Sequence, residues 1–439
     1  MKLFECKEIK KSIIKDNKIM SIPKKIAIAT VIASLTLFLG CDSLLDVSNP
    51  NSLTEEDVTQ PSAANGLKNG TLNSLMIGTA WTYAATSTIS DELRWTGSYE
   101  SYKTFDEGRI NFPSNEIIVQ GFPEISEARY MADISIENIT RFDSEGTLED
   151  RSILARTYIY SAVIRITIAD SYENFVFSAG MEAMPAIGEE NMYQLYDQAI
   201  DHATEALNVS TEIENTTLQA QALGIRARAK HAKGIWELLN PAGSTPSDPI
   251  VRGTGASADA QAALDLMPSD YKATFDYQSA LLTNYMATQV IQRRELTFNE
   301  PFNDLKTGDT DPRAEAIIND FMDTSTYTEL YPPFTWLSAR EMHLIIAEEA
   351  IGVNDSEARA TMNDVRAMNG LPGIEPGDDL VQFIEHERRA NLHFQNRRLN
   401  DMYRFGSQSD NWLPNEDAIQ RPGTLLPISS NETLANPNL

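Results

Sequence analysis

The stretch ENMYQLYDQAIDHATEALNV, residues 190–209, carries the pattern that decides the fold class. Apolar and small residues recur in it at steps of three and four, which places them on one face of a helix. These residues are Met192, Leu195, Tyr196, Ala199, Ile200, Ala203, Ala206 and Leu207. Because such a helix must cover its apolar face, the stretch predicts a protein in which helices pack on one another.

The segments around this stretch extend the helical pattern. Residues 218–239 read as an Ala-rich helix, and 151–168 as a helix that is apolar almost all round and therefore deeply buried. Ala-rich faces let helices pack closely, as in helical-pair repeats of about 34 residues. Further helices are predicted over 340–351, 355–369 and 378–405, with Gly370 ending the second and a break near Gln395 in the third.

Two internal regions and the tail read as irregular. Residues 240–270 and 298–311 are rich in Gly, Pro, Ser and Asp, and are predicted to be mostly loop. Asp311 and Pro312 then fit an N-cap and the first position of a new helix. The tail from Pro414 has no periodic pattern. No alternation of strands and helices is present, so we expect a mostly α protein, with tetratricopeptide-like helical hairpins, long irregular loops and little β structure.

The N-terminus has the organisation of a lipoprotein precursor. Lys24 and Lys25 precede an uncharged run over 26–39, which is too short to span a bilayer and ends at Gly40 and Cys41. The pattern predicts a signal peptide over 1–40, with Met20 as an alternative start, and lipidation at Cys41. A lipidated tether over 41–60 and one domain over 61–439 follow. The competing interpretation is an ordinary signal peptide with a chance Cys.

The charge balance excludes one large class of partner. The formal net charge is −27, and removal of a signal peptide over 1–40 would take away eight Lys and three acidic residues, which makes the mature chain more acidic still. Binding to nucleic acid phosphates needs a basic footprint, which this chain lacks. Membrane attachment is accordingly expected through the N-terminal lipid and not through anionic headgroups.

The densest group of charged residues lies near the C-terminus, and it allows two interpretations. It could be a ligand or catalytic cluster, or an ion-pair network that braces helices. Asp401 and Arg404 are three apart and can face each other on one helix, which favours the structural interpretation. The group consists of Glu387, Arg388, Arg398, Asp401 and Arg404.

Metal and cofactor signals are weak. Asp304, Asp309 and Asp311 could supply Ca²⁺ ligands, but the order of oxygens in a calcium loop is absent and capping by Asp311 is favoured. His386 and His393 are seven apart, which does not place two imidazoles on one zinc ion. Nucleotide-binding and nucleophile motifs are also absent. We therefore predict no metal, no cofactor and no catalytic residues.

Aromatic residues are the candidates for ligand contact. Flat apolar sugar faces stack on Trp and Tyr, while polar neighbours orient the hydroxyl groups. If these aromatic residues lie exposed in loops they can bind a glycan; the alternative is that they fill the core. The candidates are Trp81, Tyr83, Trp95, Tyr99 and Tyr102, and a second set with Trp336 beside Tyr331 and Phe334.

Four C-terminal segments carry a resemblance to the SusD/RagB family. SAREMHLIIAEEA (338–350) is similar to the family pattern A-R-E-x-x-L-I-x-A-E-A, and NDVRAMNGLP (363–372) to N-x-V-R-x-x-x-G-L-P. ERRANLHFQNRRLNDMYRFG (387–406) resembles E-R-x-x-E-L-x-F-E-G-x-R-x-x-D-L-x-R-x-G. Here Asn391 replaces Glu, and Gln395 and Asn396 replace Glu-Gly. The end, LPISSNETLANPNL (426–439), is similar to L-P-I-P-x-x-E-x-x-x-N-P-x-L.

The resemblance covers the anchor segment CDSLLDVSNP and is strongest over 330–439. It implies a non-enzymatic outer-membrane lipoprotein that faces outside, binds a glycan or a peptide, and caps a SusC-like TonB-dependent barrel transporter. Two other classes stay open on the residues alone. They are a secreted α-helical polysaccharide-degrading enzyme and a helical-repeat scaffold of the envelope.

Overall fold

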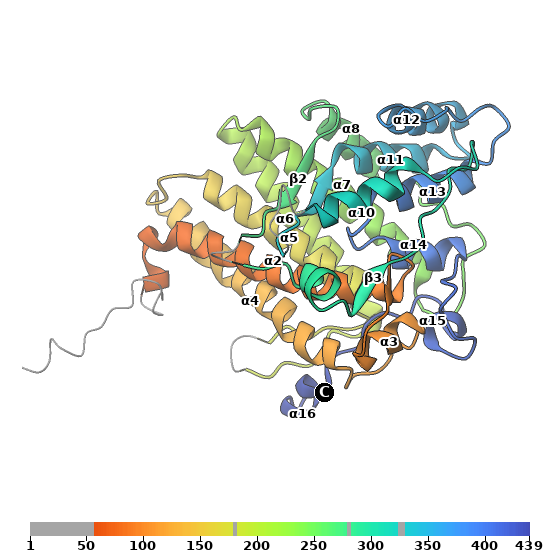
Figure 1. The fold of residues 1–439 in the computed structure, drawn as a ribbon. Coiled ribbons are helices and arrows are strands. Elements are labelled where there is room, and N and C mark those ends of the chain that lie inside the picture. Colours follow the sequence, from red (N-terminus) through yellow and green to blue (C-terminus); the bar gives the residue numbers. More distant parts are fainter. Residues whose placement is uncertain (1–56, 179–181, 279–281, 324–329) are drawn as a thin grey trace, which may run out of the picture. The chain divides into compact units, whose positions relative to one another are not determined.

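The computed structural model describes residues 57–178, 182–278, 282–323 and 330–439, all of which belong to one compact unit over 55–439. The signal peptide, Cys41 and most of the predicted tether lie outside the described residues and stay predictions. The fold is mostly helical, as expected (Figure 1). None of the described helices combines the length and the apolar character that a bilayer span requires.

Long helices form a series in which each packs on the next along the chain. The helix α2 lies beside α4, and the contacts then continue through α5, α6, α7, α8, α11 and α12 (Figure 1). This is the stacking of helical hairpins that the sequence predicts. The bounds are α2 Ala64–Ile89, α4 Glu116–Ser144, α5 Ser152–Ser171, α6 Tyr193–Glu212, α7 Thr216–Leu239, α8 Ala256–Leu264, α11 Ala339–Ala350 and α12 Asp355–Ala367.

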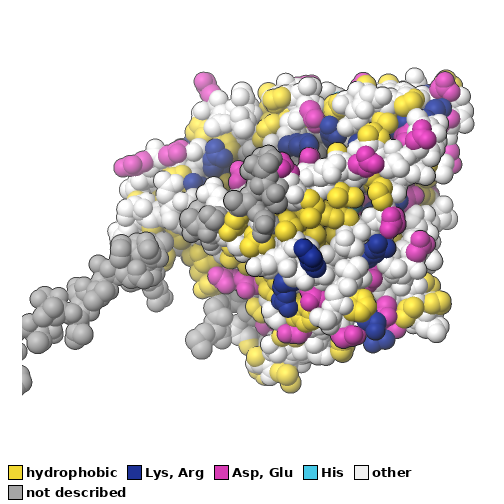
Figure 2. Space-filling view, viewed as in Figure 1, with side chains coloured by type: hydrophobic (Ala, Val, Ile, Leu, Met, Phe, Trp, Pro, Cys, Tyr) yellow, Lys and Arg dark blue, Asp and Glu magenta, His cyan; other side chains and the backbone are white. Residues whose placement is uncertain are grey.

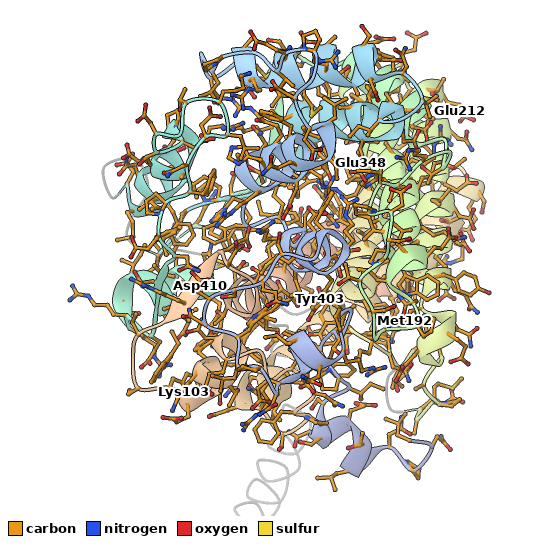
Figure 3. All side chains as sticks on the ribbon, turned by 90° about the vertical axis from the view of Figure 1, so that its right-hand side faces the viewer. Lys103, Met192, Glu212, Glu348, Tyr403 and Asp410 are labelled. Atoms are coloured by element: carbon orange, nitrogen blue, oxygen red, sulfur yellow. The ribbon has the colours of Figure 1, made fainter. Side chains whose placement is uncertain are left out.

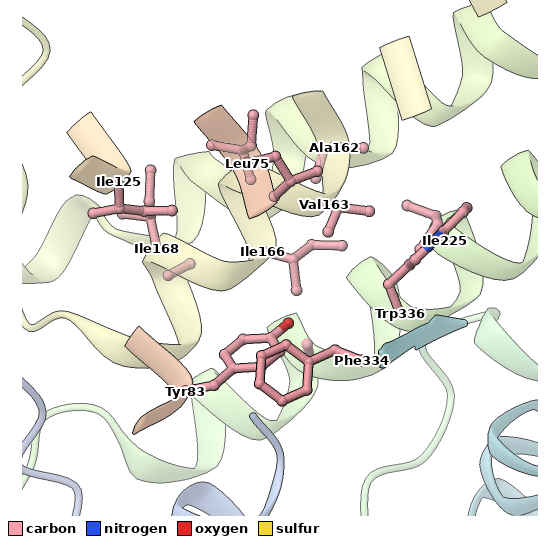
Figure 4. Close-up of a cluster of buried hydrophobic side chains, with 14 of the residues drawn as sticks. Leu75, Tyr83, Ile125, Ala162, Val163, Ile166, Ile168, Ile225, Phe334 and Trp336 are labelled. Atoms are coloured by element: carbon pink, nitrogen blue, oxygen red, sulfur yellow. The ribbon is translucent and has the colours of Figure 1, made fainter. Parts of the chain in front are cut away.

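Helix α5 forms the centre of the core, because every residue over 161–171 is buried and the helix contacts α2, α4, α6 and α7. Figure 4 shows Val163 and Ile166 of α5 surrounded by Leu75 of α2, Ile125 of α4 and Ile225 of α7. Each large aliphatic side chain buried in this way stabilises the fold by about 1.5–3 kcal/mol. The prediction that this apolar segment is deeply buried is confirmed.

Shorter elements complete the fold. The strands pair as two antiparallel ribbons, β1 with β3 and β2 with β4. Their bounds are β1 Leu93–Trp95, β2 Lys272–Phe275, β3 Leu296–Phe298 and β4 Phe334–Ser338. The remaining helices are η1 Asp57–Thr59, η2 Pro61–Ala63, α3 Glu100–Asp106, η3 Glu189–Asn191, α9 Tyr285–Ala287, the π-helical η4 Thr288–Gln292, α10 Pro312–Met322, α13 Leu380–Asn391, α14 Arg398–Phe405, α15 Asp417–Gln420 and α16 Ser430–Ala435.

Helix ends follow the local signals, and the predicted break near Gln395 separates α13 from α14. Asp311 caps α10 through Arg313 N at 2.9 Å and Pro312 takes its first position, as predicted. The segment 378–405 is two helices, α13 and α14, and the link between them includes Phe394 and Asn396 in the left-handed region, at φ 56° and 61°. The expectation that 240–270 is mostly loop misses α8. This helix is held because its buried Asp259 pairs with Arg226 and Lys230 of α7.

The charged group near the C-terminus is a buried ion-pair network. Asp401 accepts hydrogen bonds from Arg388 at 2.9 Å and from Arg404 at 2.9 Å, and Arg404 also binds Glu348 of α11. Figure 3 shows Glu348 and Tyr403 among the helices, whereas Lys103 lies at an edge. The neighbouring Arg404, together with His231, holds the pKa of the buried Glu348 well below its usual range.

The other two members of the group extend the network to distant segments. Glu387 binds Arg313 of α10 and Arg366 of α12, and Arg398 binds Asp91 through two bonds of 2.6 and 2.9 Å. The network therefore connects α7, α10, α11, α12, α13 and α14 with the segment before β1. Buried charges arranged as complementary pairs fit the structural interpretation of this group.

Candidate functional site

The aromatic candidates separate into buried and partly exposed residues. Tyr83 of α2, Tyr102 of α3 and Trp336 of β4 are only 2%, 0% and 6% exposed. The expectation that these three lie exposed in loops is wrong, because each points to the core side of a regular element. Tyr83 packs on Phe334, and Trp336 stacks on Phe275. Their position leaves them no direct surface for a ligand.

The partly exposed candidates are Trp81, Trp95 and Tyr99, and a residue that the sequence reasoning missed joins them. Tyr285 of α9 stacks on Trp81, with ring centroids 3.5 Å apart and planes at 19°. Tyr102 lies beneath, where its hydroxyl donates to the Tyr285 hydroxyl at 3.1 Å and its ring meets Tyr99 edge-on at 5.6 Å. We call Trp81, Trp95, Tyr99 and Tyr285 the aromatic surface.

One buried carboxylate shapes the loop that carries this surface. Glu295 accepts hydrogen bonds from Ser98 N at 2.7 Å and from Tyr99 N at 2.8 Å, while its own carbonyl accepts from Thr96 N and Gly97 N. A Cβ atom at Gly97 would lie 2.7 Å from the Cα of Glu295, so the loop can approach only as glycine. The loop thus fixes Trp95 and Tyr99 before any ligand arrives.

Charged and polar groups border the rings. The guanidinium of Arg293 lies 5.5 Å from the centre of the Tyr99 ring, and the ammonium of Lys103 lies 5.5 Å from that of Trp95. Burial, together with hydrogen bonding to Glu116, raises the pKa of Tyr99 to about 12, so its hydroxyl stays protonated. Flat rings with donors and acceptors at their edges are the chemistry that sugar recognition requires.

A cavity of about 510 Å³ opens beside α10, and we call it the α10 cavity. On the face of the molecule that Figure 2 shows, hydrophobic side chains gather near the centre, with acidic and basic groups around them. The walls of the α10 cavity come from β2, β4, α10, the end of α12 and the link between α13 and α14. They include Lys272, Thr274, Arg313, Asp320, Phe321, Pro332, Phe334, Thr335, Arg340, Asn369, Asn391, His393, Phe394 and Gln395.

The α10 cavity and the aromatic surface are tied together by Asn284. Its amide nitrogen Nδ2 donates to the carbonyl of Pro332 at 2.9 Å, and its backbone N donates to that of Leu330 at 2.9 Å. Pro332 lines the cavity, and Tyr285 follows Asn284 directly. The relative position of the two features is therefore fixed by a buried amide.

Two ionisable groups near the α10 cavity have perturbed pKa values. Burial, reinforced by Arg389 and Arg398, lowers the pKa of His393 to about 3, so its imidazole is neutral at pH 7. Burial raises the pKa of Glu92, whose carboxylate lies 3.5 Å from His393 Nδ1, to about 7. Both ring nitrogens of His393 are buried without a hydrogen-bond partner among the described residues.

The acidic residues considered for calcium lie in an ion-paired cluster. Asp304, Asp311 and His386 have ligand-type atoms within 4.8 Å of one another. Arg366, however, lies 2.8 Å from Asp304, and Arg313 lies 2.7 Å from Asp311. Two guanidinium groups already supply the positive charge there and would repel a metal ion, so the arrangement favours ion pairing. Asp309 is exposed outside this cluster.

Comparisons with known proteins agree with these features of fold and motif. Residues 331–422 match the model of the SusD family. A comparison with curated protein sequences finds no match.

Among solved structures, a SusD-like carbohydrate-binding protein from Bacteroides vulgatus is 15% identical, with a TM-score of 0.58, over 87% of this chain and 97% of its own. A SusD superfamily protein from Bacteroides thetaiotaomicron is 13% identical, with a TM-score of 0.61, over 86% and 98%. A SusD homolog from that organism, 13% identical over 88% and 98%, has a TM-score of 0.60. Residues 331–422 thus match the SusD family, and the chain shares the fold of these SusD-like structures over most of its length.

Proposed function

We propose that this protein binds an oligosaccharide at the aromatic surface and delivers it to a SusC-like TonB-dependent transporter. The observation that carries the proposal is the set of partly exposed rings, Trp81, Trp95, Tyr99 and Tyr285, on a loop and helices fixed by Glu295 and Asn284. A site that is organised before binding loses little conformational entropy when the ligand arrives. Binding, and not catalysis, is the activity that stacked rings provide.

Two observations support the glycan over a peptide. The aromatic surface joins the stacked pair of Trp81 and Tyr285 to the rings of Trp95 and Tyr99, and each of the latter two has a cationic group 5.5 Å from its centre. One solved structure of the same fold is described as carbohydrate-binding.

The rest of the proposal concerns location. Cys41 would carry the lipid, residues 41–60 would tether the domain, and the protein would face outside on the outer membrane beside its transporter. Replacing Cys41 by Ser should move the protein from the membrane fraction to the soluble fraction and abolish incorporation of labelled palmitate. Co-purification of a barrel transporter with the wild-type protein tests the partner.

The binding experiment uses calorimetry against a panel of plant, algal and host oligosaccharides. Trp95→Ala combined with Tyr99→Ala should weaken binding about tenfold or more, because each ring contributes roughly 0.5–1.5 kcal/mol by stacking. Phe112→Ala is the matched control, since it removes a 40% exposed ring outside the aromatic surface. Unchanged affinity in the double variant, with an unchanged melting temperature, would contradict the proposal.

A further inference from the structure

The α10 cavity has a basic group, Lys272, that forms no salt bridge among the described residues, although Arg340 and then Lys272 lower the pKa of the nearby Asp270. Lys272 lies on β2, where Ala273 and Phe275 point to the core, and Lys272 and Thr274 point outward to the cavity. The ammonium of Lys272 has no ion-pair partner among the described residues, whereas many other Lys and Arg side chains of those residues are paired. In a chain of net charge −27, an unpaired cation on a cavity wall is an attractive position for an anion.

A second cation on the same wall is only partly neutralised. Arg340 binds the half-exposed Asp270 through two bonds of 2.7 and 2.9 Å. Its remaining nitrogen, Nη1, meets the amide oxygens of Asn369 and Asn391 at 3.3 and 3.2 Å. These amides carry no charge, so the side of Arg340 that lies at the cavity keeps much of its positive field.

Two neutral amides, Asn391 and Gln395, line this wall beside Arg340. The carboxylates of the cavity are those of Asp320 and Asp323.

Gln395 also has an unfilled hydrogen-bonding position. The residue is only 5% exposed; its nitrogen Nε2 donates to the carbonyl of Asn391 at 3.1 Å, while its oxygen Oε1 is buried without a partner among the described residues. A buried acceptor without a donor costs free energy. Gln395 lies between Phe394 and Asn396, which both have left-handed backbone conformations of the kind that occur at ligand sites.

The remaining walls fit the body of a sugar. Phe321, Phe334 and Phe394 give the cavity apolar surfaces, and Asp320 on α10 has no ion-pair partner among the described residues. A carboxylate in this position accepts hydrogen bonds from hydroxyl groups. The volume of about 510 Å³ lies within the range of small-ligand sites.

We infer that the α10 cavity binds a carboxylate-bearing sugar unit, so that the protein selects acidic oligosaccharides. The carboxylate lies at Lys272 and Arg340, and the hydroxyl groups donate to Gln395 Oε1 and Asp320. This inference rests on the proposed function, because it names the class of glycan that the aromatic surface would hold. It concerns a different set of residues from that surface.

The test compares each acidic oligosaccharide with its own carboxyl-reduced form, in which the carboxylate becomes a primary alcohol. The panel contains oligomers of galacturonate, of alginate uronates and of glucuronate-containing chains, and affinities are measured by calorimetry with the full processed protein. At least one acidic form should bind tenfold or more tightly than its reduced partner. Lys272→Met should remove that preference, and Lys233→Met, on a paired lysine of α7, should keep it.

A second variant tests the amide position without a change of shape. Gln395→Glu should weaken binding of the acidic form about tenfold, and leave the reduced form within twofold. Both forms binding equally to the wild type would overturn the inference and leave the proposed function intact. No binding by any oligosaccharide would overturn both. If a short peptide bound through Lys272 while acidic sugars did not bind, the ligand would be a peptide and the inference would be wrong.

Discussion

The buried ion-pair network and the aromatic surface differ in almost every property. The network is built from Glu387, Arg388, Asp401 and Arg404, which belong to the motifs that carry the family resemblance, and it lies in the interior. The aromatic surface is built from rings in segments without a motif, and it is partly exposed. In this chain, the residues that form motifs stabilise the packing of the helices, whereas the candidate ligand-binding residues lie in segments that contain no motif.

The largest effect should come from the network. Glu348→Gln removes the charge of one of the two buried carboxylates that Arg404 and Arg388 share, and we expect a loss of about 3–5 kcal/mol in the free energy of unfolding. Denaturant titration measures the loss. Glu212→Gln, on an exposed pair with Arg151, is the control and should cost less than about 1 kcal/mol. If the two variants lost the same free energy of unfolding, the buried network would stabilise the fold no more than an exposed ion pair does.

An intermediate effect should come from the loop beneath the aromatic surface. Gly97→Ala forces a Cβ atom against the backbone of Glu295, and we expect a cost of about 1–3 kcal/mol together with weaker glycan binding. Thermal unfolding and calorimetry measure the two changes. Gly146→Ala is a control for a glycine with open space around it, although its positive φ adds some strain. Normal binding by the Gly97 variant would show that the loop need not be fixed.

A smaller effect should come from pH at the buried Glu92, which accepts hydrogen bonds from Ser87 Oγ at 2.7 Å and from Phe394 N at 2.9 Å. Its folded pKa of about 7 lies above the ordinary value of 4.5, so the folded state holds the proton more tightly than the unfolded state does. The contribution of Glu92 to stability is therefore full below about pH 4.5 and is lost as the pH rises through 7.

Glu92→Gln isolates this contribution. Relative to the wild type, the variant should gain on the order of 1 kcal/mol or more between pH 5 and pH 8, because each pKa unit corresponds to about 1.4 kcal/mol. Stability measured in denaturant at both pH values gives the difference. A gain of the same size at pH 4 and pH 8 would mean that Glu92 does not titrate in this range.

The fold was predictable where periodicity was strong. The face of 190–209, the apolar 151–168 and the cap at Asp311 gave the helices that the structure contains, because local spacing and burial agree there. The helix α8 was not predictable in this way. Its Gly- and Ser-rich surroundings resemble loop, and it is held by Arg226 and Lys230, which are distant in sequence.

The candidate site was predictable only in part. Trp95 and Tyr99 could be nominated from composition, but Tyr285 could not, since it meets Trp81 only through tertiary contacts. The same limit explains why Tyr83, Tyr102 and Trp336 were placed on the surface. A cluster of aromatics indicates that rings lie together, and the side of each element that they occupy depends on packing.

The buried amide of Asn284 has a consequence for how affinity depends on ligand length. Because its two hydrogen bonds hold the 330–332 segment against α9, the distance between the rings and the cavity cannot adjust to the ligand. A short oligosaccharide would occupy one place only. A chain long enough to reach both would bind as a bivalent ligand, and its affinity would rise in a step at one degree of polymerisation and then level off.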